Sequence, residues 1–125
     1  MPMTTQMRDF YQQAAIGEAV TAFNNANARI GAGDSSAAFA TSQTDLQAAT
    51  NKIRKGMEAG YPQRTNNVLT LRASFGTSEA NFAWNEWGVF NAASGGVMMN
   101  RKVEALGTKA SGATWMITVT LTLNV

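Results

Sequence analysis

The stretch Phe82-Ala-Trp-Asn-Glu-Trp-Gly-Val-Phe-Asn-Ala-Ala-Ser-Gly-Gly-Val-Met-Met, residues 82–99, decides the fold of this chain. Two apolar runs flank a Ser-Gly-Gly link, and this arrangement predicts two antiparallel strands joined by a glycine turn, a β-hairpin. Glu86 falls among large apolar neighbours in the first run. Because a buried carboxylate without a partner is costly, we expect Glu86 to have an internal partner or a route to water.

Alternation along the two strands assigns their side chains to faces. Trp84 and Glu86 are predicted to share one face of the first strand, and Trp87 the other. Met98 and Met99 are predicted on opposite faces, one filling the core and one forming an adaptable contact surface. We expect one tryptophan in the core and one at a subunit boundary. The candidate partners for Glu86 and Glu104 are Arg72, Arg101 and Lys102.

Two further segments show the two-residue period of half-buried strands. Residues 69–75 alternate leucine, alanine and phenylalanine with polar side chains, and residues 115–125 alternate large apolar side chains with threonine. The second segment predicts a strand that runs from Trp115 to Val125. Its threonine face is flat and uncharged, and an exposed edge of this kind recruits other chains unless it is covered. This strand is therefore either central in its sheet or used for assembly.

The amino-terminal half has a different pattern. Three- and four-residue apolar spacing predicts a long helix from residue 5 to about residue 27, with Phe23 on its apolar face and Thr4 or Thr5 as its cap. Gly17 in its middle indicates close approach by another element. The helix packs either on the domain's own sheet or on a neighbouring chain. A short strand over 28–33, a short helix over 41–49 and a polar edge strand from Lys52 follow.

These elements predict an α+β fold that is mainly β. We expect an antiparallel β-sandwich or curled sheet, with the long N-terminal helix and one short helix. Residues 1–27 are interpreted as a helical docking arm, and residues 28–125 as the β-rich domain. At 125 residues the chain can bury one core.

Composition argues against catalysis. The chain has no cysteine and no histidine, so thiol chemistry, imidazole proton transfer and the commonest metal ligand are absent. Its eight acidic residues form no tight constellation and no calcium-loop spacing. We therefore expect no enzyme activity, no cofactor and no metal.

Charge and hydropathy bound the partners. Only 14% of residues are charged, so much of the surface is neutral or covered by other proteins. Residues 51–125 carry eight basic and four acidic side chains, but the basic residues are scattered and aromatics do not interleave with them. Nucleic-acid binding is therefore disfavoured. No apolar run is long enough for a membrane helix, and the first residues lack the apolar stretch of a signal peptide, so we expect synthesis in the cytoplasm.

The hairpin region resembles a group of tailed-bacteriophage structural proteins that includes tail-fibre, tail-collar and baseplate-associated domains. The resemblance rests on Asn81-Phe82, on Asn85-Glu-Trp-Gly-Val-Phe-Asn-Ala, on Gly95-Gly96 and on Arg101. Ile30-Gly-Ala-Gly with the later Thr44-Asp-Leu is similar to the group's glycine strand and following helix. Residues 115–123 are similar to its closing strand. The resemblance implies a β-rich virion module.

It also implies that the chain is a structural subunit of a virion, with other virion proteins and its own copies as partners. Because the sequence ends directly after the last strand, without shaft or tip, we expect a tail, collar or baseplate connector. The alternatives are a capsid decoration or head-fibre subunit, and a carbohydrate-binding module that uses Trp84 and Trp87. The structural or interface candidates are Phe23, Asn81, Phe82, Trp84, Glu86, Trp87, Phe90, Met98, Met99, Arg101 and Trp115.

Overall fold

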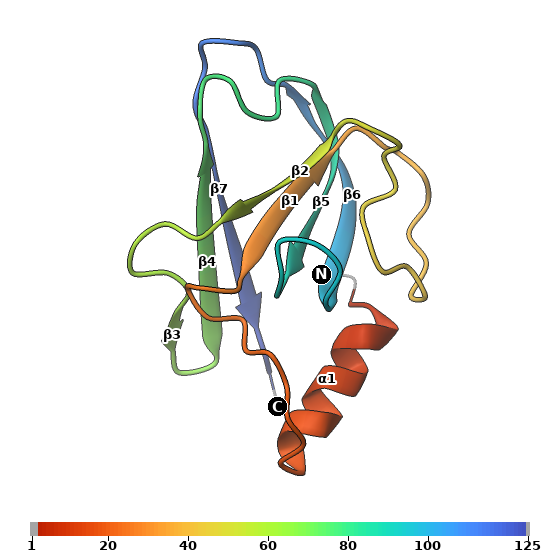
Figure 1. Ribbon diagram of the computed structural model, residues 1–125, viewed down its shortest axis with the longest axis vertical. Helices are drawn as coiled ribbons and strands as arrows, with labels where there is room; N and C mark the ends of the chain where they lie inside the picture. Colours follow the sequence, from red (N-terminus) through yellow and green to blue (C-terminus); the bar gives the residue numbers. More distant parts are fainter. Residues whose placement is uncertain (1–2, 125) are drawn as a thin grey trace.

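The computed structural model describes residues 3–124 and is mainly β, with two antiparallel sheets and one short helix (Figure 1). One sheet has the strand order β2-β1-β5-β6, and the other has the order β3-β4-β7. The elements are α1 (Thr5–Ala15), β1 (Arg29–Gly33), β2 (Lys52–Gly56), β3 (Gln63–Thr65), β4 (Val68–Phe75), β5 (Ala83–Phe90), β6 (Met98–Thr108) and β7 (Trp115–Thr122).

The two sheets share a hydrophobic core. Ile30, Val89 and Met99 of the four-stranded sheet pack in one cluster with Leu71 and Val119 of the three-stranded sheet. The alternation predicted for residues 69–75 is confirmed, because every second residue of β4 from Leu71 onward is buried. The predicted hairpin of β5 and β6 and the edge position of β2 are also confirmed.

The helix α1 ends at Ala15, so the prediction of a helix to residue 27 is wrong. Gly17 has φ +82°, its N–H donates to Ala14 O, and the N–H of Glu18 donates to Gln13 O. These two bonds form the Schellman motif that ends helices on a left-handed glycine. A Cβ at Gly17 would meet nothing within 4 Å, so the glycine ends the helix and does not mark a close approach.

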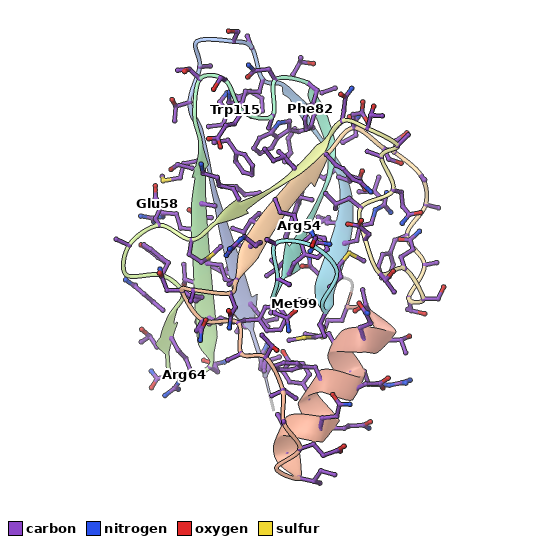
Figure 2. The ribbon with its side chains drawn as sticks, in the orientation of Figure 1. Arg54, Glu58, Arg64, Phe82, Met99 and Trp115 are labelled. Carbon is purple, nitrogen blue, oxygen red and sulfur yellow. The ribbon has the colours of Figure 1, made fainter. Side chains whose placement is uncertain are left out.

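The helix packs against the protein's own sheets. The hydroxyl of Thr4 accepts the N–H of Met7 and caps the first turn. Met7 is buried in the same cluster as Met99, which lies near α1 in Figure 2. Phe23 lies beyond the helix in irregular chain, yet it packs edge-on against Phe10 at 5.2 Å between ring centroids. The apolar spacing therefore identified core contacts correctly and misjudged the backbone that carries them.

Residues 41–49 form no helix, contrary to the prediction. They belong to a long irregular loop between β1 and β2. Leu46 of this loop packs against Phe90 and Met98. These three side chains form a cluster that is separate from the core between the two sheets. The backbone N–H groups of Gln47 and Ala48 donate to the carboxylate of Glu86 instead of to a helical turn. Tertiary hydrogen bonds thus replace local ones here.

The closing strand is shorter than predicted. β7 ends at Thr122, and Leu123 beyond it is 52% exposed instead of facing the core. Val125 lies outside the described residues. No helix within residues 3–124 has the length and apolar character needed to cross a membrane.

Candidate functional site

The sequence pattern of the hairpin centres on a buried ion pair between β5 and β6. Glu86 Oε1 lies 2.7 Å from Arg101 Nε, and neither side chain is exposed to solvent. The internal partner expected for Glu86 is therefore confirmed, and it is Arg101 among the three candidates. Removing one member of such a pair costs about 3–5 kcal/mol, because the other charge stays buried and unpaired.

The loop after β1 completes the surroundings of this pair. Glu86 Oε1 also accepts the N–H of Gln47 at 2.7 Å, and Oε2 accepts the N–H groups of Ala48 at 2.9 Å and Ser35 at 3.3 Å. Arg101 Nη1 donates to Ala37 O at 3.0 Å. Together the pair and residues 35–48 form what we call the Glu86 centre. It fastens a long irregular loop to the sheet.

An irregularity between β5 and β6 changes the predicted faces. The register shifts between Trp84 and Glu86, because Trp84 pairs with Gly107 and Glu86 pairs with Val103, so the extra residues lie in β6. Trp84 and Trp87 both pack in the core between the sheets, and Glu86 points to the opposite side, where it meets the loop. The prediction that Trp84 and Glu86 share a face is therefore wrong, because strict alternation is not kept where the ladder between the two strands is disrupted.

Two glycines make room for the Glu86 centre. Gly33 lies opposite Glu86 in the β1–β5 register, and a Cβ there would press on Glu86 Oε2. A Cβ on Gly88 would lie 2.6 Å from the carbonyl oxygen of Asn100. Any side chain at either position requires the sheet or the ion pair to shift.

An aromatic cluster closes the end of the molecule far from α1. The Trp84 ring packs edge-on against Phe75 at 4.9 Å and Trp115 at 5.1 Å between centroids. Its indole N–H donates to Ala80 O, and Phe82 packs on the same cluster, near Trp115 in Figure 2. Trp84 is only 2% exposed. Trp84 is therefore a core tryptophan, and the subunit-boundary position expected for the other tryptophan stays a prediction.

The remaining candidate residues also make hydrogen bonds or cation–π contacts within the chain. Asn81 Oδ1 accepts a hydrogen bond from the ammonium group of Lys109 at 2.7 Å. Lys109 is buried, and its ammonium group also donates to Gly76 O. The guanidinium of Arg54 lies 3.6 Å from the centroid of the Phe90 ring. Trp87 is half-buried, and its N–H donates to Glu104 Oε2 at 3.1 Å.

Both methionines of β6 are buried. Met98 packs with Leu46 and Phe90 on the loop side of the sheet, and Met99 packs in the core between the sheets. Their opposite faces are as predicted, but the contact-surface role expected for one of them is wrong. The reason is that the irregular loop covers the second face of this sheet.

Apolar side chains are exposed along the outer strands β6 and β7. Leu106 is 40% exposed and Met116 57% exposed, and they line a hollow of about 450 Å³ with Trp84, Trp115 and Ile117. A second hollow, of about 200 Å³, lies at the other end of β7. These hollows form the second candidate site, an apolar docking surface.

Three groups have shifted pKa values. Burial tends to raise the pKa of Asp45, but hydrogen bonds from Lys52 and Arg54 lower it by more. The pKa of Asp45 therefore lies below its ordinary value. The hydrogen bond from Lys55 lowers the pKa of Glu79. Burial raises the pKa of Tyr11. Each shifted carboxylate belongs to a salt bridge, which is typical of structural pairs.

The arrangement is suited to holding elements together. Within residues 3–124, no three histidine, cysteine, aspartate or glutamate side chains gather as a metal site would require. Comparisons of the chain with protein-family models, with curated proteins and with solved structures give no match.

Sequence reasoning missed several of the residues that make these internal hydrogen bonds. Lys109 and Asn100 are buried polar residues that it did not single out, and the buried Asn91 entered only as part of the resemblance, without a structural role. Asn91 closes the hairpin, because its Oδ1 accepts the N–H of Val97 at 2.7 Å and its Nδ2 donates to Thr21 O. An asparagine directly after an apolar strand is a turn signal that could have identified it. No local pattern marks Lys109.

Proposed function

We propose that this chain is a non-enzymatic structural subunit of a tailed-phage virion. It acts as a tail, collar or baseplate connector, and it assembles with its own copies and with other virion proteins through helix and strand-edge contacts. The packing of two sheets on one core supports a β-sandwich as its architecture.

One observation carries this proposal: the residues behind the resemblance to phage proteins are the ones that tie the frame together. Asn81 holds Lys109, Glu86 holds Arg101, and Asn91 closes the hairpin. Residues used in this way support a scaffold, because each of these side chains binds another part of the same chain. This supports a module whose shared feature is its shape.

The carbohydrate-binding alternative has less support. Sugar stacking needs an exposed aromatic face, and the Trp84 ring is buried between Phe75 and Trp115. Trp87 is half-buried and engaged with Glu104. The two tryptophans therefore do not form a joint platform, and the assembly function is preferred.

The test is mass spectrometry of purified virions, followed by localisation in intact particles by electron microscopy. We expect the chain at a fixed copy number on the tail, collar or baseplate. Copies distributed over the whole capsid surface would favour the capsid-decoration alternative instead. Absence from virions that form while the chain is expressed would overturn the proposal.

A further inference from the structure

Each sheet has two outer strands, and three of these four edges carry features that discourage pairing with another chain. Strand β2 carries Lys52, Arg54 and Lys55, and β3 is only three residues long. An isolated bridge joins Met3 to Asn100 in the first half of β6, and the strand is irregular because of its bulges. Charge, shortness, cover and bulges are the usual protections of sheet edges.

The fourth edge, on β7, has none of these protections. Its eight residues contain no charged residue, no proline and no glycine. It pairs with β4 in an unbroken register on one side, and within residues 3–124 no strand pairs with its other side. Met116, Thr118, Thr120 and Thr122 are exposed. A long, regular and neutral edge of this kind is a template for another strand.

Apolar features at the two ends of β7 complement each other. At the beginning of the strand lies the hollow lined by Leu106, Met116 and Ile117. At its end, Leu123 is exposed beside Tyr11, at the second hollow. One end thus offers a space, and the other offers a protruding apolar side chain.

An antiparallel pair of β7 strands would bring these ends together. If Thr120 lies opposite Thr120 of a second copy, Thr118 lies opposite Thr122 and Ile117 lies opposite Leu123. Each Leu123 then enters the hollow beside Ile117 of the other copy, and two-fold symmetry repeats the contact. Cross-strand threonine pairs are favourable, and the register brings no like charges together.

We propose that two copies of this chain pair edge to edge through β7, antiparallel and centred on Thr120, so that their three-stranded sheets become one continuous sheet. A second copy is the occupant because the same edge supplies both the protruding leucine and the hollow that receives it. The inference rests on the proposed assembly function and names one contact of that assembly.

A cysteine at the symmetry axis tests the register. The chain has no cysteine of its own, so a single introduced thiol can form only an intermolecular disulfide. Directly opposed Cβ atoms lie about 4.5–5.5 Å apart, and a disulfide needs about 3.5–4.5 Å, so the two strands must approach by up to about 1 Å for the bond to form. We expect mild oxidation to convert Thr120→Cys to a covalent dimer, and Thr65→Cys, at an exposed threonine of β3, to stay monomeric. Equal cross-linking of the two variants would overturn the register.

A charge at the same position tests the pairing without a covalent bond. We expect the unmodified chain to sediment as a dimer, and Thr120→Lys to weaken the dimer by at least about tenfold, because like charges directly opposed are destabilising. Thr65→Lys is the matched control and should leave the dimer unchanged. Circular dichroism confirms that each variant is folded. A wild-type chain that stays monomeric at high concentration would overturn the proposal.

The β7 pairing and the proposed function can fail separately. A monomeric chain that is nevertheless found in purified virions would overturn the β7 pairing and leave the proposed function standing. A β7-linked dimer that is absent from virions would support the pairing and overturn the proposed function.

Discussion

Glu86 Oε1 lies 2.7 Å from Arg101 Nε, and the same oxygen accepts the backbone N–H of Gln47 at the same distance. The carboxylate therefore holds two parts of the chain at once: the neighbouring strand β6 and the loop that covers the sheet. Both side chains are fully buried, so water cannot take the place of either partner. The pair is a joint between secondary structure and irregular chain.

Replacing Glu86 is expected to destabilise the protein strongly. Glu86→Ala leaves the buried guanidinium without its counter-charge and the loop N–H groups without an acceptor, so we expect a loss of about 3–5 kcal/mol in the free energy of unfolding. Urea unfolding followed by tryptophan fluorescence measures it. Glu18→Ala, at an exposed carboxylate beyond α1, is the control and should change stability by less than about 1 kcal/mol.

A double variant separates the ion pair from the loop joint. Replacing an isolated buried pair by apolar residues of similar size is often neutral. Here Glu86→Leu with Arg101→Met would still leave the N–H groups of Gln47 and Ala48 unpaired, so we expect the double variant to stay about 2 kcal/mol or more below wild type. Full recovery of stability would show that the loop bonds contribute nothing.

Two glycines in the four-stranded sheet give a matched comparison. A Cβ on Gly88 would lie 2.6 Å from the backbone oxygen of Asn100, whereas one on Gly56 would meet only the Arg29 side chain, at 3.6 Å. We expect Gly88→Ala to cost about 1–3 kcal/mol by overpacking. Gly56→Ala should be neutral or slightly stabilising, since alanine restricts the unfolded chain. Equal effects in thermal melting would contradict this account.

The sequence predicted most of the β structure because two-residue alternation is a local signal. Leu71, Ala73 and Phe75 are buried as that alternation requires. The register shift between Trp84 and Glu86 is not part of that alternation, and it places Trp84 on the face opposite to Glu86. Its extra residues lie in β6 next to Gly107, which has φ +100°. Strict alternation therefore fails where the register of the two strands shifts.

The long loop could not be predicted for a different reason. Its backbone groups are satisfied by Glu86, which lies some forty residues further along the chain. Local composition around Asp45 favoured a short helix, but the carboxylate provides acceptors that a short isolated helix cannot match. The partner of Glu86 could be narrowed to three basic residues from the sequence, and only the register of β5 with β6 selects Arg101.

The end of α1 provides a test of backbone conformation alone. Gly17 has φ +82° with open space around it, so a substitution there adds strain without a clash. We expect Gly17→Ala to cost about 1 kcal/mol, and Gly17→Asn less, because asparagine tolerates the left-handed region better. Chemical denaturation measures the difference. Equal stability of the alanine variant and wild type would show that the Schellman turn is not formed in solution.

The lowered pKa of Asp45 predicts how the stability of the folded protein changes at acid pH. Its pKa in the folded protein lies below the ordinary value, so its contribution is present above about pH 4, the ordinary pKa of an aspartate, and is lost as pH falls through the folded pKa. We expect Asp45→Asn to lower stability at neutral pH and to flatten the loss below pH 4. Since the carboxylate is partly exposed, solvent screens the interaction and the effect is about 0.5 kcal/mol.

The pairing with Lys52 can be checked in the same measurement. Lys52 Nζ lies 3.1 Å from Asp45 Oδ2 and is one of the two side-chain donors that lower the pKa of Asp45. Lys52→Gln removes that charge, so the acid limb of a urea midpoint against pH should shift toward higher pH, because the carboxylate then takes up its proton earlier. In the Asp45→Asn background the same lysine change should leave the acid limb where it is. An equal shift in both backgrounds would mean that the lysine acts on another carboxylate.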